Sequence, residues 1–374
     1  MDLSAIPAVD QHAHNLLRRE EVASLDYRSA FTEAMDSEAV QRHAEETLFF
    51  RRSIREMAEV LECDPFLAAV LDARDRLGFD EIARRFFGAA GLEAVLLDDG
   101  FVPERILPVA WHSRFAPARR LLRVERLAEE LIETVDRWTE FEERFRHTVG
   151  EPPPDVAGLK SIVAYRTGLI VEVPEEGKAM ECFWRLRQAA RRGGSVRLAC
   201  KPLNDWVVRE TLLAAARTSM PVQFHTGFGD PDLDLRLANP LHLRPLLEEP
   251  ALGGVRFVLL HAAYPFSREA GYLAAVYPNL FVDFGLAVPS LSVPGMAWAI
   301  CALMELAPLT KILYASDAHS LPELFYLGAR WGRRVLGAEL DRCIADGELV
   351  PAEAERAAEM ILRGNAVRLY GLQL

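Results

Sequence analysis

Near its start the chain reads Ala8-Val9-Asp10-Gln11-His12-Ala13-His14, a short apolar run that ends in two histidines. Three later apolar runs end in a similar way, at His225, His261 and Asp317. Short runs rich in β-branched and aromatic residues are typical of buried parallel strands. In a (β/α)8 barrel the C-terminal ends of the strands meet at one mouth, where catalysis takes place. These runs therefore predict an α/β barrel whose mouth gathers imidazoles and a carboxylate.

The two histidines of the opening stretch are separated by one residue. Side chains alternate along a strand with period two, so we expect both rings on the same face. Imidazoles together with a carboxylate make a site for a borderline-hard divalent metal ion. The pattern predicts a metalloenzyme.

Strand-like runs recur along the whole chain. With the first run at 9–14 we count eight, the number a closed (β/α)8 TIM barrel needs; the others are 94–97, 106–111, 159–165, 221–225, 257–261, 280–284 and 312–315. Helical stretches separate most of them. A further strand-like run at 196–200 makes the count ambiguous.

The pattern changes abruptly after His14. Residues 15–93 are charged and helical in period, as in 38–48 and 51–61. An insertion this long after the first strand lies at the C-terminal face of the sheet. We therefore expect one barrel domain over 1–374, with a helical cap inserted at 15–93 above the mouth.

Composition limits the partners and the compartment. The formal net charge of −12 argues against nucleic acid and anionic membranes. No signal peptide or membrane span is visible at the start, so we expect a cytoplasmic protein. The five cysteines are scattered, without a Cys-x-x-Cys pair, which indicates neither a disulfide framework nor a thiolate zinc site. A homodimer is the base-rate expectation.

Several motifs, in order along nearly the whole chain, resemble a known family. They include Asp10-Gln11-His12-Ala13-His14-Asn15, Gln223-Phe224-His225-Thr226-Gly227, Ser316-Asp317-Ala318-His319 and the closing Gly364-Asn365-Ala366-Val367-Arg368-Leu369-Tyr370-Gly371. The chain resembles the amidohydrolase superfamily in its amidohydrolase-2 branch of metal-dependent TIM barrels. The similarity is to the barrel domain found alone in bacteria or fused ahead of a glutamine-synthetase-like domain.

The resemblance implies a role for each residue at a strand end. His12, His14, His225 and Asp317 correspond to metal ligands, and Asp317 also accepts the proton of the nucleophilic water. His261 corresponds to a histidine that is a ligand in binuclear relatives and contacts substrate or water in mononuclear ones. We favour the second role, in which His261 polarises the group to be cleaved.

The number of metal ions depends on Lys160. Binuclear relatives use a carbamylated lysine at the end of the fourth strand, whereas Lys160 stands at the start of its run and should lie deep in the barrel or at its base. We therefore expect one divalent ion, with zinc as the default and manganese or iron compatible.

Two further residues are candidates for substrate contacts. Arg166 stands where a fourth-strand side chain would reach the mouth, and its guanidinium suits a carboxylate; a surface ion pair is an equal alternative. If the strand continues past Asp317, the side chain of His319 points to the same face. We therefore expect His319 to support the neighbouring metal ligands.

The ligand set predicts hydrolysis of an amide or related C–N or ester bond in a small, possibly carboxylated molecule. A metal-activated water would attack, with Asp317 as general base and then general acid. Non-oxidative decarboxylation with the same ligands is the main alternative, and uronate isomerisation a weaker one. An alternative of another class is a non-catalytic barrel that acts as a binding or assembly module.

Overall fold

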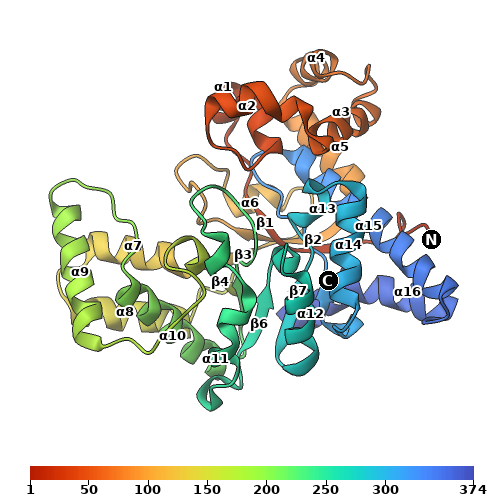
Figure 1. The fold of residues 1–374 in the computed structure, drawn as a ribbon. Helices are drawn as coiled ribbons and strands as arrows, with labels where there is room; N and C mark the ends of the chain where they lie inside the picture. Colours follow the sequence, from red (N-terminus) through yellow and green to blue (C-terminus); the bar gives the residue numbers. More distant parts are fainter.

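The computed structural model describes residues 1–374, with Glu176 described by its backbone alone. Eight parallel strands form one sheet in chain order, and Figure 1 shows them at the centre with helices around them. The strands are β1 Ala8–His14, β2 Leu92–Asp98, β3 Ala118–Arg123, β4 Val156–Ser161, β5 Pro221–Phe224, β6 Arg256–Leu259, β7 Leu280–Asp283 and β8 Ile312–Leu313. The predicted (β/α)8 TIM barrel is confirmed.

Backbone hydrogen bonds join the first strand to the segment after the last. The Asp317 amide donates to the His12 carbonyl at 3.0 Å, and the His14 amide donates to the Ala318 carbonyl at 2.7 Å. These bonds bring the sheet close to a complete barrel. They also fix Asp317 beside the two histidines of β1.

The third strand differs from the prediction. The run 106–111 is not a strand of the barrel: Ile106 makes only an isolated bridge to Leu17, and α6 Val109–His112 follows. The strand is instead β3, which carries Arg119, Arg120 and Arg123. The hydrophobic pattern does not reveal β3, because the arginines of this strand are balanced by ion pairs in the folded protein. Arg123 pairs with Asp98 at 2.7 Å, and Arg120 pairs with Asp99 at 2.8 Å.

Two other strand expectations need correction. The run 196–200 is not a strand. The fourth strand ends at Ser161, and the second half of the expected run is a 3-10 turn at Val163–Tyr165. The mouth end of β4 therefore comes earlier in the chain than the sequence suggests.

Helices occupy most of the segments between the strands. Between β1 and β2 lie α1 Arg19–Ser24, α2 Ser37–His43, α3 Leu48–Leu61, α4 Leu67–Leu77 and α5 Phe79–Ala90, with a 3-10 turn at Tyr27–Phe31. The later helices are α7 Val124–Thr134, α8 Trp138–Gly150, α9 Glu176–Arg191, α10 Lys201–Thr218, α11 Arg244–Leu247, α12 Ser267–Val276, α13 Ala287–Ser290, α14 Val293–Met304, α15 Pro322–Ala345, α16 Pro351–Glu359 and α17 Asn365–Tyr370.

The insertion after β1 divides into two parts. In Figure 1, α1 to α4 gather above one end of the barrel. The last helix, α5, packs against α15 instead; Phe87 lies 4.7 Å from Phe325 and Phe86 lies 5.7 Å from Tyr326, measured between ring centroids. The position of α5 is that of an outer barrel helix, so the additional helices of 15–93 are α1 to α4.

The helix α3 shows how the insertion folds locally. The Thr47 side chain accepts a hydrogen bond from the Phe50 amide at 3.1 Å and so caps the first turn. Phe50, Ile54, Met57 and other apolar residues at helical spacing are buried. This apolar stripe explains why the segment lies against the barrel.

Buried charges attach the insertion to α15. Arg74 on α4 pairs with Glu323, whose side chain is fully buried, and the Tyr27 hydroxyl donates to the same carboxylate at 3.2 Å. Arg52 on α3 donates to the carbonyl of Leu291 and lies over the Trp331 ring, 4.7 Å from its centroid. Because a charge removed from water needs a close partner, these contacts define one position of the insertion.

The opposite end of the barrel is filled by side chains of the C-terminal helix α17. Leu369 and Tyr370 pack with Val9 of β1 and Leu96 of β2 in one apolar cluster. The Tyr370 hydroxyl donates to Gln11 Oε1 at 2.6 Å and accepts from Gln223 Nε2 at 2.8 Å. This end is packed, so the open end is the one with the histidines.

One disulfide contradicts the expectation from the cysteines. Cys182 on α9 is bonded to Cys200, which directly precedes α10, with their Cα atoms 6.1 Å apart. They are 18 residues apart in the chain and meet because α9 packs against α10. Spacing along the chain does not reveal such a tertiary pair.

Of the helices in the described part of the chain, not one combines the length and the apolar character needed to cross a membrane.

The Arg74–Glu323 pair yields a test of how the insertion is held. Arg74→Met should lower the free energy of unfolding by about 3–5 kcal/mol, because it leaves the buried Glu323 carboxylate without its cation. Arg42→Met, which removes an exposed pair with Glu38 on α2, should change it little. Urea unfolding followed by circular dichroism measures both, and equal effects of the two substitutions would contradict the assignment.

Candidate metal centre

The end of β1 places two imidazoles next to a carboxylate. His12 Nε2 lies 3.0 Å from Asp317 Oδ1, and His14 Nε2 lies 3.4 Å from the same oxygen. The register of the β1–β2 pairing shifts between Asp10 and Ala13, a stretch that includes His12. His12 is fully buried, and His14 remains partly exposed.

Asp10 holds Asp317 in place from the neighbouring strand. Its carboxylate accepts hydrogen bonds from the Ser316 amide at 2.9 Å and from the Ser316 hydroxyl. Asp317 itself has a φ of +54°, a left-handed conformation that non-glycine residues adopt only where the surroundings impose it. The strand end is therefore shaped to present this carboxylate.

The remaining two histidines follow β5 and β6. His261 Nε2 lies 3.0 Å from His225 Nδ1, and His261 Nδ1 lies 3.9 Å from Asp317 Oδ2. The Asp283 carboxylate of β7 accepts a hydrogen bond from the His261 amide at 2.7 Å. The other ring nitrogen of His225, Nε2, forms a hydrogen bond with the Phe228 carbonyl oxygen at 3.1 Å. The four histidines at the strand ends thus lie around Asp317. His12, His14 and His261 are next to it, and His225 contacts His261.

The donors present fit a divalent cation. One ligand atom from each of His12, His261 and Asp317 lies within 4.8 Å of the others. His12 Nδ1 and His261 Nδ1 are buried without a hydrogen-bond partner among the described residues. Buried polar atoms are normally satisfied, so this cluster is one that an ion would complete.

The protonation states suit ligation. Burial lowers the pKa of His12 to about 4, and it lowers the pKa values of His225 and His261 well below the ordinary value. Burial alone would raise the pKa of Asp317, but His261, His12 and His14 hold it well below its usual range. Neutral imidazoles and an ionised carboxylate are the forms that bind metal.

Lys160 lies at the mouth, which corrects the prediction that it lies deep or at the base. Its Nζ is 3.3 Å from His12 Nε2, and the side chain is fully buried. The error follows from the early end of β4 at Ser161. Burial lowers the pKa of Lys160 to about 8, against the opposing effect of Asp98 and Asp317.

The two candidate substrate residues lie in different surroundings. Arg166 Nη2 is 3.4 Å from Glu129 Oε1, in a mostly buried ion pair. His319 lines the cavity above Asp317, and burial lowers its pKa to about 4. Of the two, His319 is the one placed to meet a ligand in that cavity.

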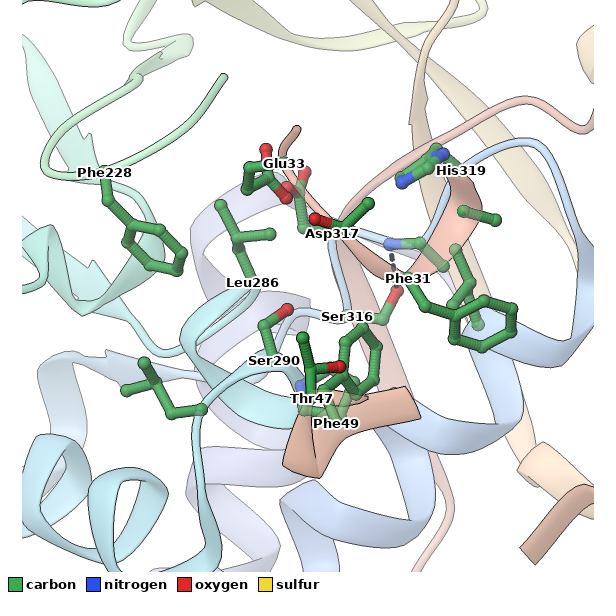
Figure 2. A pocket seen from close by; sticks show the side chains of 16 residues that line it. Phe31, Glu33, Thr47, Phe49, Phe228, Leu286, Ser290, Ser316, Asp317 and His319 are labelled. Carbon is green, nitrogen blue, oxygen red and sulfur yellow. Dashed lines mark hydrogen bonds between the residues drawn. The ribbon is translucent and has the colours of Figure 1, made fainter. Parts of the chain in front are cut away.

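The cavity lies between the barrel mouth and the insertion, with a volume of about 220 Å³. Figure 2 shows Asp317 and His319 on one side of it, with Phe31, Glu33 and Phe49 from the insertion. Glu33 is not predicted from the sequence, because a single glutamate in a charged helical insertion carries no motif. Only the packing of the insertion brings it to the mouth.

A parallel barrel with histidines and an aspartate at its mouth is an architecture of metal-dependent enzymes. The sequence profile described as Amidohydrolase matches residues 185–372, about half of the chain. The chain belongs to the amidohydrolase family, as its motifs predicted.

Individual relatives agree with this assignment. A solved structure from Lactobacillus casei, provisionally described as a metal-dependent hydrolase, superposes with a TM-score of 0.84 at 30% identity, covering 100% of this chain and 99% of that one. Protein fluG of Emericella nidulans is 33% identical over 98% of this chain and 46% of its own length. This chain therefore spans less than half of fluG.

A more distant structure shares the fold. The uronate isomerase of Thermotoga maritima superposes with a TM-score of 0.64 at 14% identity, covering 98% of this chain and 95% of that chain. At this identity the likeness concerns the barrel and says nothing about the reaction.

The corrected position of Lys160 removes the sequence-based reason for expecting a single ion, and the expectation now rests on the one group of possible ligand atoms found among the described residues, those of His12, His261 and Asp317. We expect about one divalent ion per chain after metal supplementation, and the same content in Lys160→Met. Plasma mass spectrometry of purified protein measures both, with Lys178→Met, an exposed lysine of α9, as the matched control. Two ions in the wild type and one in Lys160→Met would instead assign Lys160 to a second metal position.

Proposed function

We propose that this protein is a metal-dependent hydrolase that cleaves an amide or related C–N or ester bond in a small molecule. The observation that carries the proposal is the convergence of His12, His14 and His261 on the Asp317 carboxylate at the mouth of the barrel. His12, His14, His225 and Asp317 are the ligands that the resemblance implies, and we propose them here; the geometry adds His261 as a further candidate, because one of its ring nitrogens groups with His12 and Asp317. Zinc is the proposed ion, with manganese and iron compatible.

The bound ion would supply positive charge that acidifies a water molecule and polarises a carbonyl group. Asp317 lines the cavity and is ionised, so its carboxylate is suited to take the proton of the attacking water and return it to the leaving group. His261, fixed through its amide by Asp283, is suited to polarise the carbonyl oxygen. His319 supports the neighbouring groups from the cavity wall.

The helices α1 to α4 act as the cap in this proposal. Phe31, Glu33 and Phe49 from this segment face the cavity above Asp317. Because the insertion is attached by buried ion pairs, it is suited to exclude bulk water and to contact the substrate.

A cytoplasmic location and a homodimer remain part of the proposal.

The lining limits how a carboxylated substrate could be held. Among the described residues that line the cavity, none is an arginine or a lysine. Arg166, the predicted carboxylate contact, is paired with Glu129. A substrate carboxylate in this space would therefore have the bound ion as its counter-charge, in a hydrolase and in a decarboxylase alike, so hydrolysis stays the proposal and decarboxylation its alternative.

Replacement of Asp317 tests the proton transfer. Asp317→Asn should lower kcat by about 10²–10⁴-fold, because the amide cannot accept the proton of water. Circular dichroism should show an unchanged fold, and Asp346→Asn, an exposed residue after α15, should keep full activity. Steady-state kinetics on a panel of amides and esters makes the comparison, and a fully active Asp317→Asn would refute the proton-transfer role.

The products separate the alternatives. Release of an amine or alcohol from an amide or ester supports the hydrolase, whereas release of carbon dioxide from a carboxylic acid supports the decarboxylase. Metal analysis tests the third alternative, since a chain that stays empty after supplementation with zinc or manganese is better explained as a binding or assembly module.

A further inference from the structure

The cavity above Asp317 combines apolar walls with acidic groups. Its apolar wall comes from both the insertion and the barrel loops, including Phe31, Phe49, Phe228, Leu286 and Leu324. The carboxyl groups in the lining are those of Glu33 and Asp317. A ligand that fits this space therefore needs an apolar body and a group that the carboxylates of the lining do not repel.

Glu33 lies in the cavity without a counter-charge. It stands between the 3-10 turn Tyr27–Phe31 and α2, and its side chain is partly buried. Among the described residues it has neither a hydrogen-bond partner nor an ion-pair partner. Its side chain lines the cavity, so a cationic ligand there would supply the counter-charge that the described residues do not.

The nearby arginines do not fill this place. The Arg52 guanidinium donates to the carbonyls of Pro289 and Leu291 and lies over Trp331. Arg166 is held by Glu129. Each is committed to a structural contact, which leaves Glu33 free to meet a ligand.

The charges around Glu33 are themselves negative. Burial, together with the carboxylates of Asp317 and Asp230, raises the pKa of Glu33 to about 7. Figure 2 shows the Glu33 and Asp317 carboxylates next to each other. A divalent ion would neutralise Asp317 but would leave Glu33 uncompensated, because Glu33 is not among the predicted ligands.

We infer that the substrate carries a protonated amine on an apolar body, and that Glu33 is the specificity-determining residue that binds this amine. The inference rests on the proposed function, since the amine belongs to the molecule that is hydrolysed. A charge-assisted hydrogen bond to Glu33 would fix the amine. The aromatic rings of Phe31 and Phe228 suit a cation, and the cavity of about 220 Å³ suits a small one. The substrate class is a small amide or ester with a free ammonium group.

A binding experiment tests this without a known substrate. The probes share one branched apolar body: 3-methylbutylamine, 3-methylbutan-1-ol and 3-methylbutanoate. Calorimetric titration at pH 7 into the metal-loaded wild type should show the amine binding about tenfold or more tighter than the alcohol and the carboxylate. Glu33→Gln should remove this preference, and Glu38→Gln, an exposed glutamate on α2 of the same insertion, should keep it.

Several results would overturn the inference. They are a carboxylate that binds as well as the amine, an amine that does not bind the wild type, and a preference that persists in folded Glu33→Gln. The last result would mean that another group of the cavity, such as the Asp317 carboxylate, holds the amine.

The same measurements separate this inference from the proposed function. A Glu33-dependent preference for the amine in a protein that turns over no amide or ester supports Glu33 as the residue that binds the amine and refutes the hydrolase. Turnover of an ammonium-bearing substrate and its neutral analogue at equal rates, unchanged in Glu33→Gln, refutes the inference and supports the hydrolase.

Discussion

The site depends on one buried carboxylate that is placed among imidazoles by the closure of the barrel. The backbone bond from the Asp317 amide to the His12 carbonyl joins the last strand to the first. It places Asp317 Oδ1 3.0 Å from His12 Nε2, although the two residues are far apart in the chain. Removing a carboxylate from water is costly unless cations or donors surround it, so the imidazoles and the carboxylate stabilise one another's positions. An ion held between them would complete this balance.

The barrel and its insertion contribute different properties. Strand ends supply the histidines and Asp317, and the rigid ladder of β1 to β8 determines how far apart these groups lie. The insertion supplies the opposite wall, including Glu33 and Phe49. It is attached through Arg74 and Glu323, so that wall has a defined position even though it lies outside the barrel. Chemistry and substrate choice are thus assigned to separate parts of one chain.

The similarity to the solved structures extends over the barrel and the insertion. The superposition on the Lactobacillus casei structure covers 100% of this chain at 30% identity, and that on the uronate isomerase covers 98% of it at 14% identity. A barrel mouth with metal ligands supports many reactions, because loops and insertions differ while strand ends persist. In this chain we therefore look for substrate selection in the insertion, where Glu33 lines the cavity.

The sequence alone determined the class of fold and the residues of the mouth. His12, His14, His225, His261 and Asp317 were recognisable because each ends a run of apolar residues, a local signal that neighbouring positions carry. Other features depended on tertiary structure. The strand β3 was hidden because its arginines are neutralised by partners from other segments, and Lys160 was misplaced because β4 ends at Ser161. The Cys182–Cys200 bond and the place of Glu33 arise from contacts between segments distant in sequence. Local patterns report burial and periodicity, whereas neutralisation of charge and the meeting of separate segments are properties of the folded chain alone.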